Sequence, residues 1–227
     1  QLSQGGTTLP DRDYYLKSDA RSLIIQKSYK NYITSLFALS GSSTTEAEKA
    51  AETIFNIEKT LAAAQMSRVE MRDPYKTYNK FSVTEFSKTT SNLNWQSLMP
   101  LMKVSGQDTV LVNSPKFFSA LNGLFSTTPI NNLKTYLKWN VLKSSAPYLS
   151  SEFVNASFAF TQILTGQKVQ TPRWQRMSSL TDGTVGDLLG QIYVKKHFKP
   201  EAKARMQELV SNLVKAYEIR IQNLDWM

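Results

Sequence analysis

Apolar residues recur at alternating steps of three and four along most of this 227-residue chain, and this spacing restricts the fold more than any other feature. A period of this kind places apolar side chains on one face of an α-helix. It is clearest over residues 18–40, over residues 45–64, and after the pair Lys199-Pro200. We therefore predict an all-α fold, a mainly helical multi-helix lobe with at most a short strand or hairpin near residues 104–112.

The first two helices are predicted to form an antiparallel pair. Gly41 supplies a left-handed stop to the first of them. Thr45, with Glu48 three residues later, has the pattern of a capping box that opens the second. The predicted buried faces are Ile25, Tyr29, Tyr32, Leu36 and Leu39 in the first helix, and Ala47, Ala50, Ile54, Ile57, Leu61 and Ala64 in the second.

The middle of the chain is predicted to hold shorter elements. Residues 82–87, with Ser82 and Glu85 as a capping box, and residues 94–102 are typical of short helices. The β-branched run at residues 109–112 indicates a strand. Ser114-Pro115 and Thr128-Pro129 each place a cap residue before a proline suited to the first helical position.

Several helices are predicted after residue 114. The helix that opens at Pro115 would bury Leu121, Leu124 and Phe125, and the helix that opens at Pro129 would bury Leu133, Leu137, Asn140 and Val141. Phe153, Phe160, Ile163 and Leu164 carry the next stripe, which Gly166 closes. A long pattern follows Pro172 as far as Phe198, and the final helix would bury Met206, Leu209, Leu213, Tyr217, Ile221 and Leu224. With no fixed repeat and no convincing linker, we predict one helical domain over residues 1–227.

Composition narrows the possible partners. The formal charge is +9, but lysines and arginines are spread along the chain, which favours a solvated basic surface over a nucleic-acid footprint. No nucleic acid is expected as a partner. No stretch approaches the roughly 18 apolar residues of a membrane span, so we expect a soluble segment without one. Because the chain begins with Gln1, its N-terminus is interpreted as mature or trimmed, with any signal peptide or anchor upstream.

The inventory of reactive side chains argues against a catalytic site. There are no cysteines, and His197 is the single histidine. A zinc hydrolase of the two-histidine helix type needs two imidazoles one turn apart. Gly183, Gly186 and Gly190 lie within a helical pattern rather than after a strand, which argues against a phosphate loop. Gly186 and Gly190, four residues apart, instead predict close approach of a neighbouring helix. We predict no catalytic, no cofactor-binding and no metal-binding residue in this chain.

Large aromatic and arginine side chains are interpreted as structural. Core or helix-interface packing is expected of all four tryptophans, Trp95, Trp139, Trp174 and Trp226. The arginines are expected to form ion pairs or to clamp loops, because a guanidinium satisfies a carboxylate or two carbonyls at once. The expected sets are Arg12 with Asp13, Arg68 with Glu70, Arg72 with Asp73, and Arg173 with Arg176.

Six segments, in order and in register, resemble one family. They are residues 9–15 (LPDRDYY), 67–74 (SRVEMRDP) followed by Tyr78-Asn79, 133–139 (LKTYLKW), 172–176 (PRWQR), 185–186 (VG) with 190–194 (GQIYV), and 224–227 (LDWM). This set is similar to the N-terminal helical region of the neprilysin-type zinc endopeptidases, which include the endothelin-converting enzymes and the oligopeptidases O.

The resemblance implies more than this chain contains. In that family a helical lobe faces a catalytic lobe across a large cavity. The catalytic lobe carries the HExxH zinc helix, a downstream zinc-binding glutamate and a backbone-binding Asn-Ala strand, all C-terminal to the segment at residues 224–227. The resemblance therefore implies zinc in the full-length parent and none in this chain. It also implies a catalytic domain of the same polypeptide as a partner, and peptide substrates of limited size.

Two interpretations remain open at this point. In the first, the chain is the substrate-gating lobe of a periplasmic or extracellular zinc endopeptidase, inactive as isolated, although a cytoplasmic location is also compatible. In the second, it is a stand-alone helical binding module for anionic peptides or nucleic acid.

Overall fold

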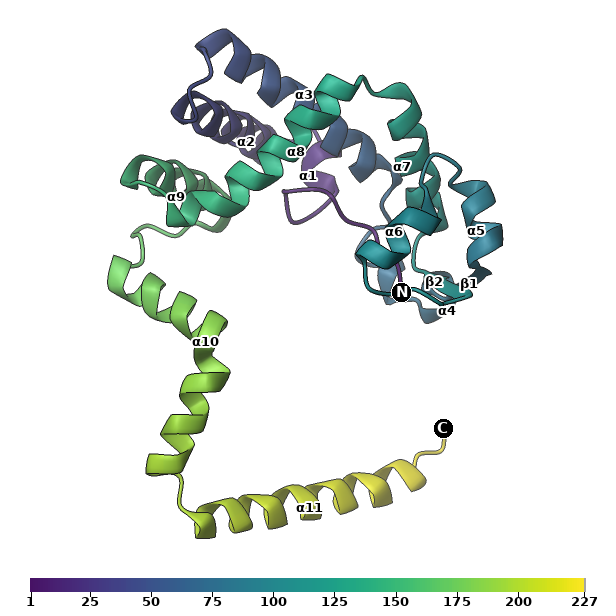
Figure 1. Ribbon diagram of the computed structural model, residues 1–227, viewed down its shortest axis with the longest axis vertical. Coiled ribbons are helices and arrows are strands. Elements are labelled where there is room, and N and C mark those ends of the chain that lie inside the picture. Colours follow the sequence, from purple (N-terminus) through teal and green to yellow (C-terminus); the bar gives the residue numbers. More distant parts are fainter. Residues whose placement is uncertain (227) are drawn as a thin grey trace. The chain divides into compact units, whose positions relative to one another are not determined.

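The computed structural model describes residues 1–226, and Met227 lies outside the described part (Figure 1). The chain divides into two compact units, Gln1–Lys168 and Val169–Met227. The described residues are mainly helical and contain a single two-stranded sheet, which confirms the predicted fold class. The single domain expected over residues 1–227 stays a prediction.

Unit 1 holds most of the secondary-structure elements. In chain order they are α1 (Asp13–Leu16), α2 (Ala20–Leu39), α3 (Thr44–Ala64), the 3-10 helix η1 (Glu70–Arg72), α4 (Pro74–Thr77), β1 (Asn79–Ser82), α5 (Val83–Thr89), α6 (Trp95–Leu101), β2 (Thr109–Val112), α7 (Pro115–Thr127), α8 (Ile130–Ser145), the 3-10 helix η2 (Ala146–Tyr148) and α9 (Ser151–Thr165). Unit 2 holds α10 (Arg173–His197) and α11 (Pro200–Gln222).

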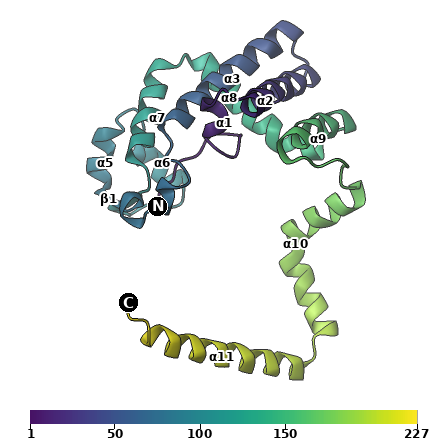
Figure 2. The same ribbon diagram turned by 180° about the vertical axis from the view of Figure 1, so that it is seen from behind.

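Helix α3 lies at the centre of unit 1, where it packs against α2, α7 and α8 (Figures 1 and 2). Its start differs from the prediction. Ser43 is the N-cap, its hydroxyl accepts from the Glu46 amide at 3.4 Å, and the Glu46 carboxylate accepts from the Ser43 amide at 2.9 Å. The capping box at Thr45 and Glu48 is therefore wrong. Gly41, with φ of 92°, ends the turn after α2. Ser43 then caps α3, so the helix begins at Thr44, one residue earlier than predicted.

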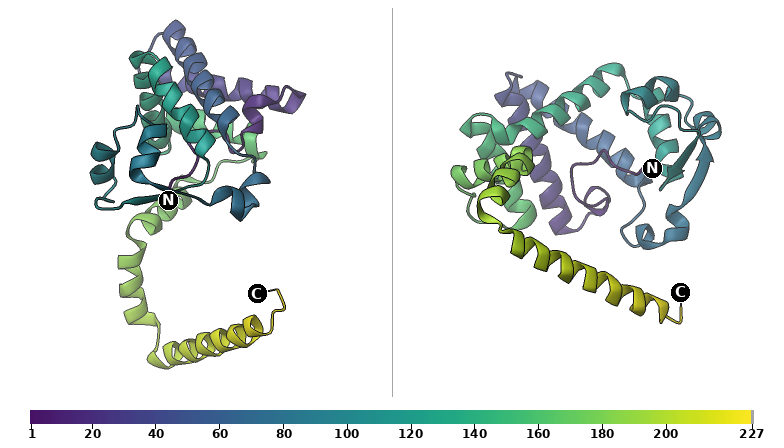
Figure 3. Two further views of the ribbon diagram at one scale, coloured as in Figure 1. Left: turned by 90° about the vertical axis from the view of Figure 1, so that its right-hand side faces the viewer. Right: turned by 60° about the horizontal axis from the view of Figure 1, so that its bottom comes forward.

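The sheet joins segments that are distant in sequence. Strand β2 was predicted, but its partner is β1, and the two pair antiparallel from Asn79 opposite Val112 to Ser82 opposite Thr109. Helices α5 and α6 lie between them in the chain, so the two strands do not form a local hairpin. Leu2 adds a parallel bridge to Val112, and Figure 3 shows the N-terminus beside this sheet. The short helices α5 and α6 confirm the predictions for residues 82–87 and 94–102.

Helix α8 begins one residue later than predicted. Pro129 is the N-cap, with an extended ψ of 139°, and the first helical residue is Ile130. The Thr128 amide instead bonds the Leu124 carbonyl at 2.9 Å and so completes α7. By contrast, Pro115 is the first residue of α7 as predicted, and Gly166, with φ of 78°, closes α9.

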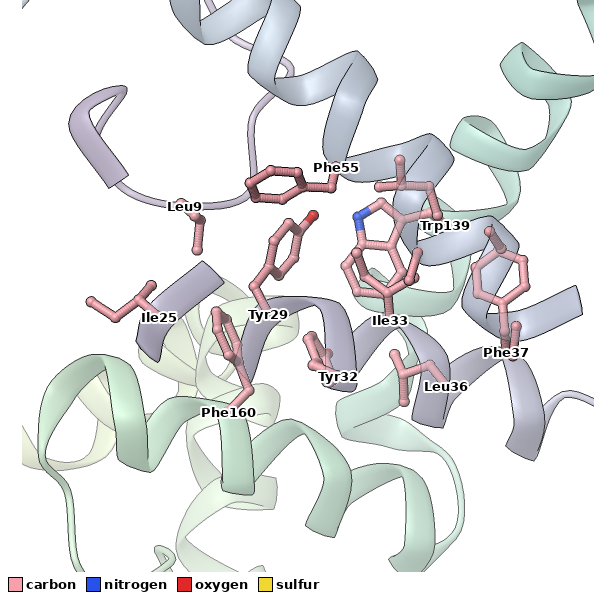
Figure 4. Packing of buried hydrophobic residues seen from close by; sticks show 14 of the residues in the cluster. Leu9, Ile25, Tyr29, Tyr32, Ile33, Leu36, Phe37, Phe55, Trp139 and Phe160 are labelled. Carbon is pink, nitrogen blue, oxygen red and sulfur yellow. The ribbon is translucent and has the colours of Figure 1, made fainter. Parts of the chain in front are cut away.

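The larger core lies among α2, α3, α8 and α9 and is rich in aromatic rings (Figure 4). Tyr32 stacks on Phe160 with their centroids 5.2 Å apart, and Trp139 meets Tyr32 edge-on at 5.3 Å. A second core of Ile57, Leu61, Phe86, Trp95, Val112, Phe117, Phe118 and Leu124 lies between α3, α7 and the sheet. The predicted buried face of α3 is confirmed throughout, since every residue named for it is buried.

The predicted faces of five other helices are partly or wholly wrong. Leu39, Phe125, Leu137, Val141 and Ile163 are exposed, whereas Ile33, Phe37 and Trp139 are buried instead. In α11 none of the predicted residues is buried, and those exposed are Met206, Leu209, Leu213, Tyr217 and Ile221. Helix α8 shows the reason most clearly, because it packs against both α2 and α3. Trp139 lies in the core with residues of these two helices, while Leu137 and Val141 remain exposed.

Two of the four tryptophans are buried as predicted, and two are exposed. Trp95 and Trp139 are buried as predicted. Trp174 and Trp226 are exposed over 67% and 75% of their surface. For these two residues the prediction of core or helix-interface packing is therefore wrong within the described part of the chain. Both belong to unit 2, which buries no residue of α10 or α11 in the part of the chain that the structure describes. No helix within residues 1–226 has the length and apolar character needed to cross a membrane.

Candidate functional site

A buried carboxylate holds the N-terminal segment of the chain against the helices of unit 1. Glu58 lies on α3 and has no exposed surface. Its Oε2 atom accepts from the Tyr15 hydroxyl at 2.6 Å and from the Tyr29 hydroxyl at 2.7 Å. Its Oε1 atom accepts from the Thr8 hydroxyl at 2.8 Å, and the Thr8 amide lies 3.2 Å from Oε2. One side chain thus joins the N-terminal segment, α1, α2 and α3.

The tyrosine on α1 extends this network into the backbone. The Tyr15 oxygen accepts from the amides of Thr8 and Leu9, at 3.0 and 2.8 Å, while its proton goes to Glu58. Burial raises the pKa of Tyr15 well above its ordinary value, and the charge of Glu58 raises it further. Burial and the same charge also raise the pKa of Tyr29. Both phenols therefore remain hydrogen-bond donors over any physiological pH.

A cation and an indole complete the network from α8. The Thr8 hydroxyl oxygen accepts from Lys143 Nζ at 3.0 Å and from Trp139 Nε1 at 3.3 Å. Burial lowers the pKa of Lys143, and the nearby charge of Glu58 opposes that shift. A buried carboxylate that accepts several hydrogen bonds near a cation is compensated for its lost hydration. Every group around Glu58 is engaged, so this arrangement is suited to holding structure and not to transferring protons.

Two arginines clamp the same segment, although with partners other than those predicted. Arg12 donates to the Gln65 carbonyl. Arg68 donates to the Pro10 carbonyl at 3.0 Å and pairs with Asp11 at 2.9 Å. The clamping role is confirmed for both. The pairs of Arg12 with Asp13 and Arg68 with Glu70 are wrong, because these acids face local partners, Lys17 and the amide of Ser67.

Of the other two arginine sets, one differs from the prediction and one contains a predicted clamp. Asp73 caps α4 and lies 3.7 Å from Lys76 rather than pairing with Arg72. Arg176 donates to the Thr171 carbonyl at 3.1 Å, which is the predicted loop clamp.

Beside this network lies an apolar pocket of about 300 Å³. Its floor includes Gly5 and Gly6 of the N-terminal segment, and its walls come from α3, α7 and α8. The Tyr136 hydroxyl on α8 donates to the Gly6 carbonyl, and this hydrogen bond joins the N-terminal segment to α8. Gly6 has φ of 76°, a conformation that favours glycine. The volume equals the lower end of the range for small-molecule pockets.

We predict that Gly6→Ala destabilises unit 1 by about 1–3 kcal/mol. An added Cβ would lie 3.1 Å from Leu61 Cδ1 and 3.2 Å from the Tyr136 oxygen, in a left-handed backbone conformation. Gly5→Ala is the matched control, because its Cβ would meet nothing within 4 Å. Denaturant unfolding of the two variants measures the difference. Equal stability of both variants would show that the segment shifts freely.

The described residues do not fit a zinc site. Within residues 1–226, no group of three or more histidine, cysteine, aspartate or glutamate side chains is placed to hold a metal ion. His197, the single histidine, packs its ring on Tyr193 at 4.8 Å, near the end of α10. The predicted absence of catalytic and metal-binding residues stays a prediction. A Cβ added at Gly190 would meet nothing within 4 Å, and one at Gly186 would meet only Asp182 of the same helix at 4.0 Å, so the predicted close approach of a neighbouring helix is not found within unit 2.

The sequence-based reasoning missed Glu58, Thr8 and Lys143. A signal for the first was available, because Glu58 falls one turn from both Ile54 and Leu61 within the buried stripe of α3. An acidic residue on such a stripe requires buried donors. Thr8 and Lys143 gave no comparable signal, since only the folded chain brings the N-terminal segment to α8.

Solved structures of peptidases share this architecture. The Mycobacterium tuberculosis zinc metalloprotease Zmp1 in its open state matches with a TM-score of 0.84 and 30% identity, over 99% of this chain and 35% of that one. PepO from Lactobacillus rhamnosis matches with a TM-score of 0.76 over 99% of this chain and 36% of that one; at 19% identity it shows the fold alone. The fold is thus that of a helical region found in metalloproteases.

The family follows from the sequence comparisons. The N-terminal profile of peptidase family M13 matches residues 1–227, and the chain belongs to this family. Human endothelin-converting enzyme 1 is 27% identical over the whole chain, which covers 30% of that protein. Drosophila melanogaster neprilysin-3 is 26% identical over the whole chain, again covering 30%. The chain therefore spans about a third of the length of these relatives, and the resemblance seen in the sequence is confirmed.

Proposed function

We propose that this chain is the substrate-gating helical lobe of a neprilysin-like zinc metalloendopeptidase, and that it is inactive by itself. The supporting observation is that the whole chain matches about a third of the length of its relatives, and that one of these relatives is a zinc metalloprotease. In this proposal, the complete polypeptide hydrolyses peptide bonds. The catalytic domain and its zinc lie in the part of the polypeptide that the chain does not represent.

The properties of unit 1 suit a gate. A gate restricts substrates by size only if its walls keep their shape, because a folded protein must be excluded while an extended peptide enters. Glu58 and the two arginine clamps tie the N-terminal segment to α3, and aromatic packing joins α2, α8 and α9. A close-packed core of this kind resists deformation. The proposed substrates are therefore peptides of limited size.

The charge of the chain adds a preference to the same proposal. A net charge of +9 gives the lobe a positive field, which attracts anions at moderate ionic strength. Acidic peptides, or the C-terminal carboxylates of peptides, would be concentrated near it. The proposed location is the periplasm or the cell exterior, where peptides of this kind are available. Nucleic acid is not a proposed partner.

Peptide hydrolysis tests the proposal. The complete polypeptide should cleave a short fluorogenic peptide, leave a folded protein intact, and lose its activity when a chelator removes the metal. The isolated chain of residues 1–227 should cleave neither substrate, with or without added zinc. Metal-dependent cleavage by the isolated chain would contradict the proposal, and so would a complete polypeptide without chelator-sensitive activity.

A further inference from the structure

The apolar pocket of about 300 Å³ beside the Glu58 network has walls that belong entirely to unit 1. Its shape therefore does not depend on where unit 2 lies. Residues 3–6 of the N-terminal segment contribute to it together with α3, α7 and α8. Among the side chains that line it within residues 1–226, only those of Ser3 and Tyr136 carry a polar atom, and none is charged. The pocket thus offers concave apolar surface inside one compact unit.

The walls of the pocket are held in place by the second core. The rings of Phe117 and Phe118 meet edge-on with their centroids 5.4 Å apart, and Phe118 meets Phe86 edge-on at 5.5 Å. Phe117 and Phe118 line the pocket, and both are almost fully buried. On the side of α8, the Tyr136 hydroxyl is bonded to the Gly6 carbonyl. Because these side chains are already fixed, a ligand can bind with little reorganisation of the site.

Two apolar residues that line the pocket remain in contact with water. Phe125 of α7 and Leu137 of α8 are exposed over 43% and 63% of their surface. The helical spacing predicted that both are buried, and the folding of unit 1 leaves them uncovered. Exposed apolar side chains around a concave site are typical of a ligand-binding groove. A ligand in the pocket would cover part of this surface.

The lining determines the chemical class of the ligand. A charged or strongly polar group would lose its hydration there and find no compensating partner. The four aromatic side chains of the lining favour another ring, because aromatic pairs gain from edge-to-face and offset contacts; they are Phe117, Phe118, Phe125 and Tyr136. The pocket, at about 300 Å³, has twice the volume of the roughly 150 Å³ apolar cavity that binds benzene in another protein. It therefore has room for one ring or two fused rings.

We propose that this pocket binds an uncharged aromatic ring system of about the size of indole. Two sources carry this chemistry, a free small molecule and the aromatic side chain of a peptide. The site is built from unit 1 alone, so the proposal does not rest on the proposed peptidase function.

Photolabelling of the complete polypeptide tests the proposal, with benzophenone as the probe. Benzophenone is uncharged and aromatic, and under near-ultraviolet light it inserts into C–H bonds close to it. Mass spectrometry of the digested protein then locates the adducts. We expect them in α7 and α8, and excess indole should reduce them by about tenfold or more, as competition for one site requires. N-acetyltryptophanamide distinguishes the two sources, because it competes only if the pocket admits a ring attached to a peptide backbone.

Two results of this experiment would overturn the proposal. The first is an absence of adducts in α7 and α8 of the complete polypeptide, which is the result expected if another segment of the polypeptide fills the pocket. The second is a set of adducts that excess indole does not reduce, which is the result expected of adsorption to the surface. Competition by indole, with or without competition by N-acetyltryptophanamide, would support the proposal.

A filling variant places the binding in this pocket. Leu133→Trp adds a large ring to the lining on α8, and Ile130→Trp is the matched control, because Ile130 lies on the same helix, is exposed and does not line the pocket. Leu133→Trp should reduce the adducts in α7 by about tenfold or more, since the new ring occupies the same space, while Ile130→Trp should change them by about twofold or less. Equal labelling of α7 in the two variants would overturn the proposal.

A second variant enlarges the pocket and is needed in case circular dichroism shows that Leu133→Trp does not fold. Leu121→Ala removes lining atoms from the side of α7, and the structure around such a substitution relaxes only in part. The larger space should favour the two rings of benzophenone over indole. The ratio of the dissociation constant of indole to that of benzophenone, measured by equilibrium dialysis, should rise by about threefold or more. An unchanged ratio would overturn the proposal.

Discussion

Replacing Glu58 with alanine is expected to lower the free energy of unfolding of unit 1 by about 3–5 kcal/mol. The carboxylate accepts from Tyr15, Tyr29 and Thr8 in a place without exposed surface. Its removal leaves buried donors without acceptors, together with a cavity. Each unsatisfied buried polar group costs about 1–3 kcal/mol. Urea unfolding followed by tryptophan fluorescence measures the loss.

Two variants serve as controls for Glu58→Ala. Glu52→Ala removes a carboxylate from the same helix, where it bonds Lys30 at 2.7 Å at the surface, and should change the stability by about 1 kcal/mol or less. Glu58→Gln retains the shape of the side chain but turns one acceptor into a donor, so an intermediate loss is expected. A loss in Glu58→Ala no larger than that in Glu52→Ala would show that the carboxylate does not anchor the N-terminal segment.

Trp139→Ala is expected to cost about 3–5 kcal/mol, because a large ring leaves a close-packed core that relaxes only in part. The side chain has no exposed surface and meets Tyr29 and Tyr32 at 5.9 and 5.3 Å between ring centroids. Its indole N–H also lies 3.3 Å from the Thr8 hydroxyl, so the substitution weakens the network around Glu58 as well. Thermal or urea unfolding of residues 1–227 measures the effect.

Leu137→Ala is the matched control, on the same helix and two residues away. It is exposed over 63% of its surface, so its truncation should change the stability of the isolated chain by about 0.5 kcal/mol or less. The two variants distinguish the burial seen in the structure from the burial predicted by the sequence pattern, in which Leu137 was a buried residue. A larger loss for Leu137→Ala than for Trp139→Ala would reverse the orientation of α8.

Glu58 and Trp139 act on the same atom, the Thr8 hydroxyl, so their substitutions should not be additive. Residues that share a hydrogen-bond network commonly differ from additivity by about 0.5–3 kcal/mol. Such coupling would support the rigid gate that we propose, because it would show that one threonine links the N-terminal segment to α8.

Local sequence alone determined the helices, several of their ends and the family. The reason is that periodicity, capping residues and proline or glycine stops act over a few residues. The box at Ser82 and Glu85, the stop at Gly166 and the start at Pro115 needed no distant contact. Where two local signals competed, as at Ser43 and Thr45, the sequence could not choose between them.

Only the tertiary structure decided which face of each helix is buried, how β1 finds β2, and what surrounds Glu58. These features join residues far apart in the chain, such as Thr8 with Lys143 or Asn79 with Val112, and no local pattern records such pairs. Helix α8 illustrates the physical reason. It carries apolar residues on more than one side, and burial follows the side that α2 and α3 cover, so neighbours and not spacing placed Trp139 in the core and left Leu137 outside.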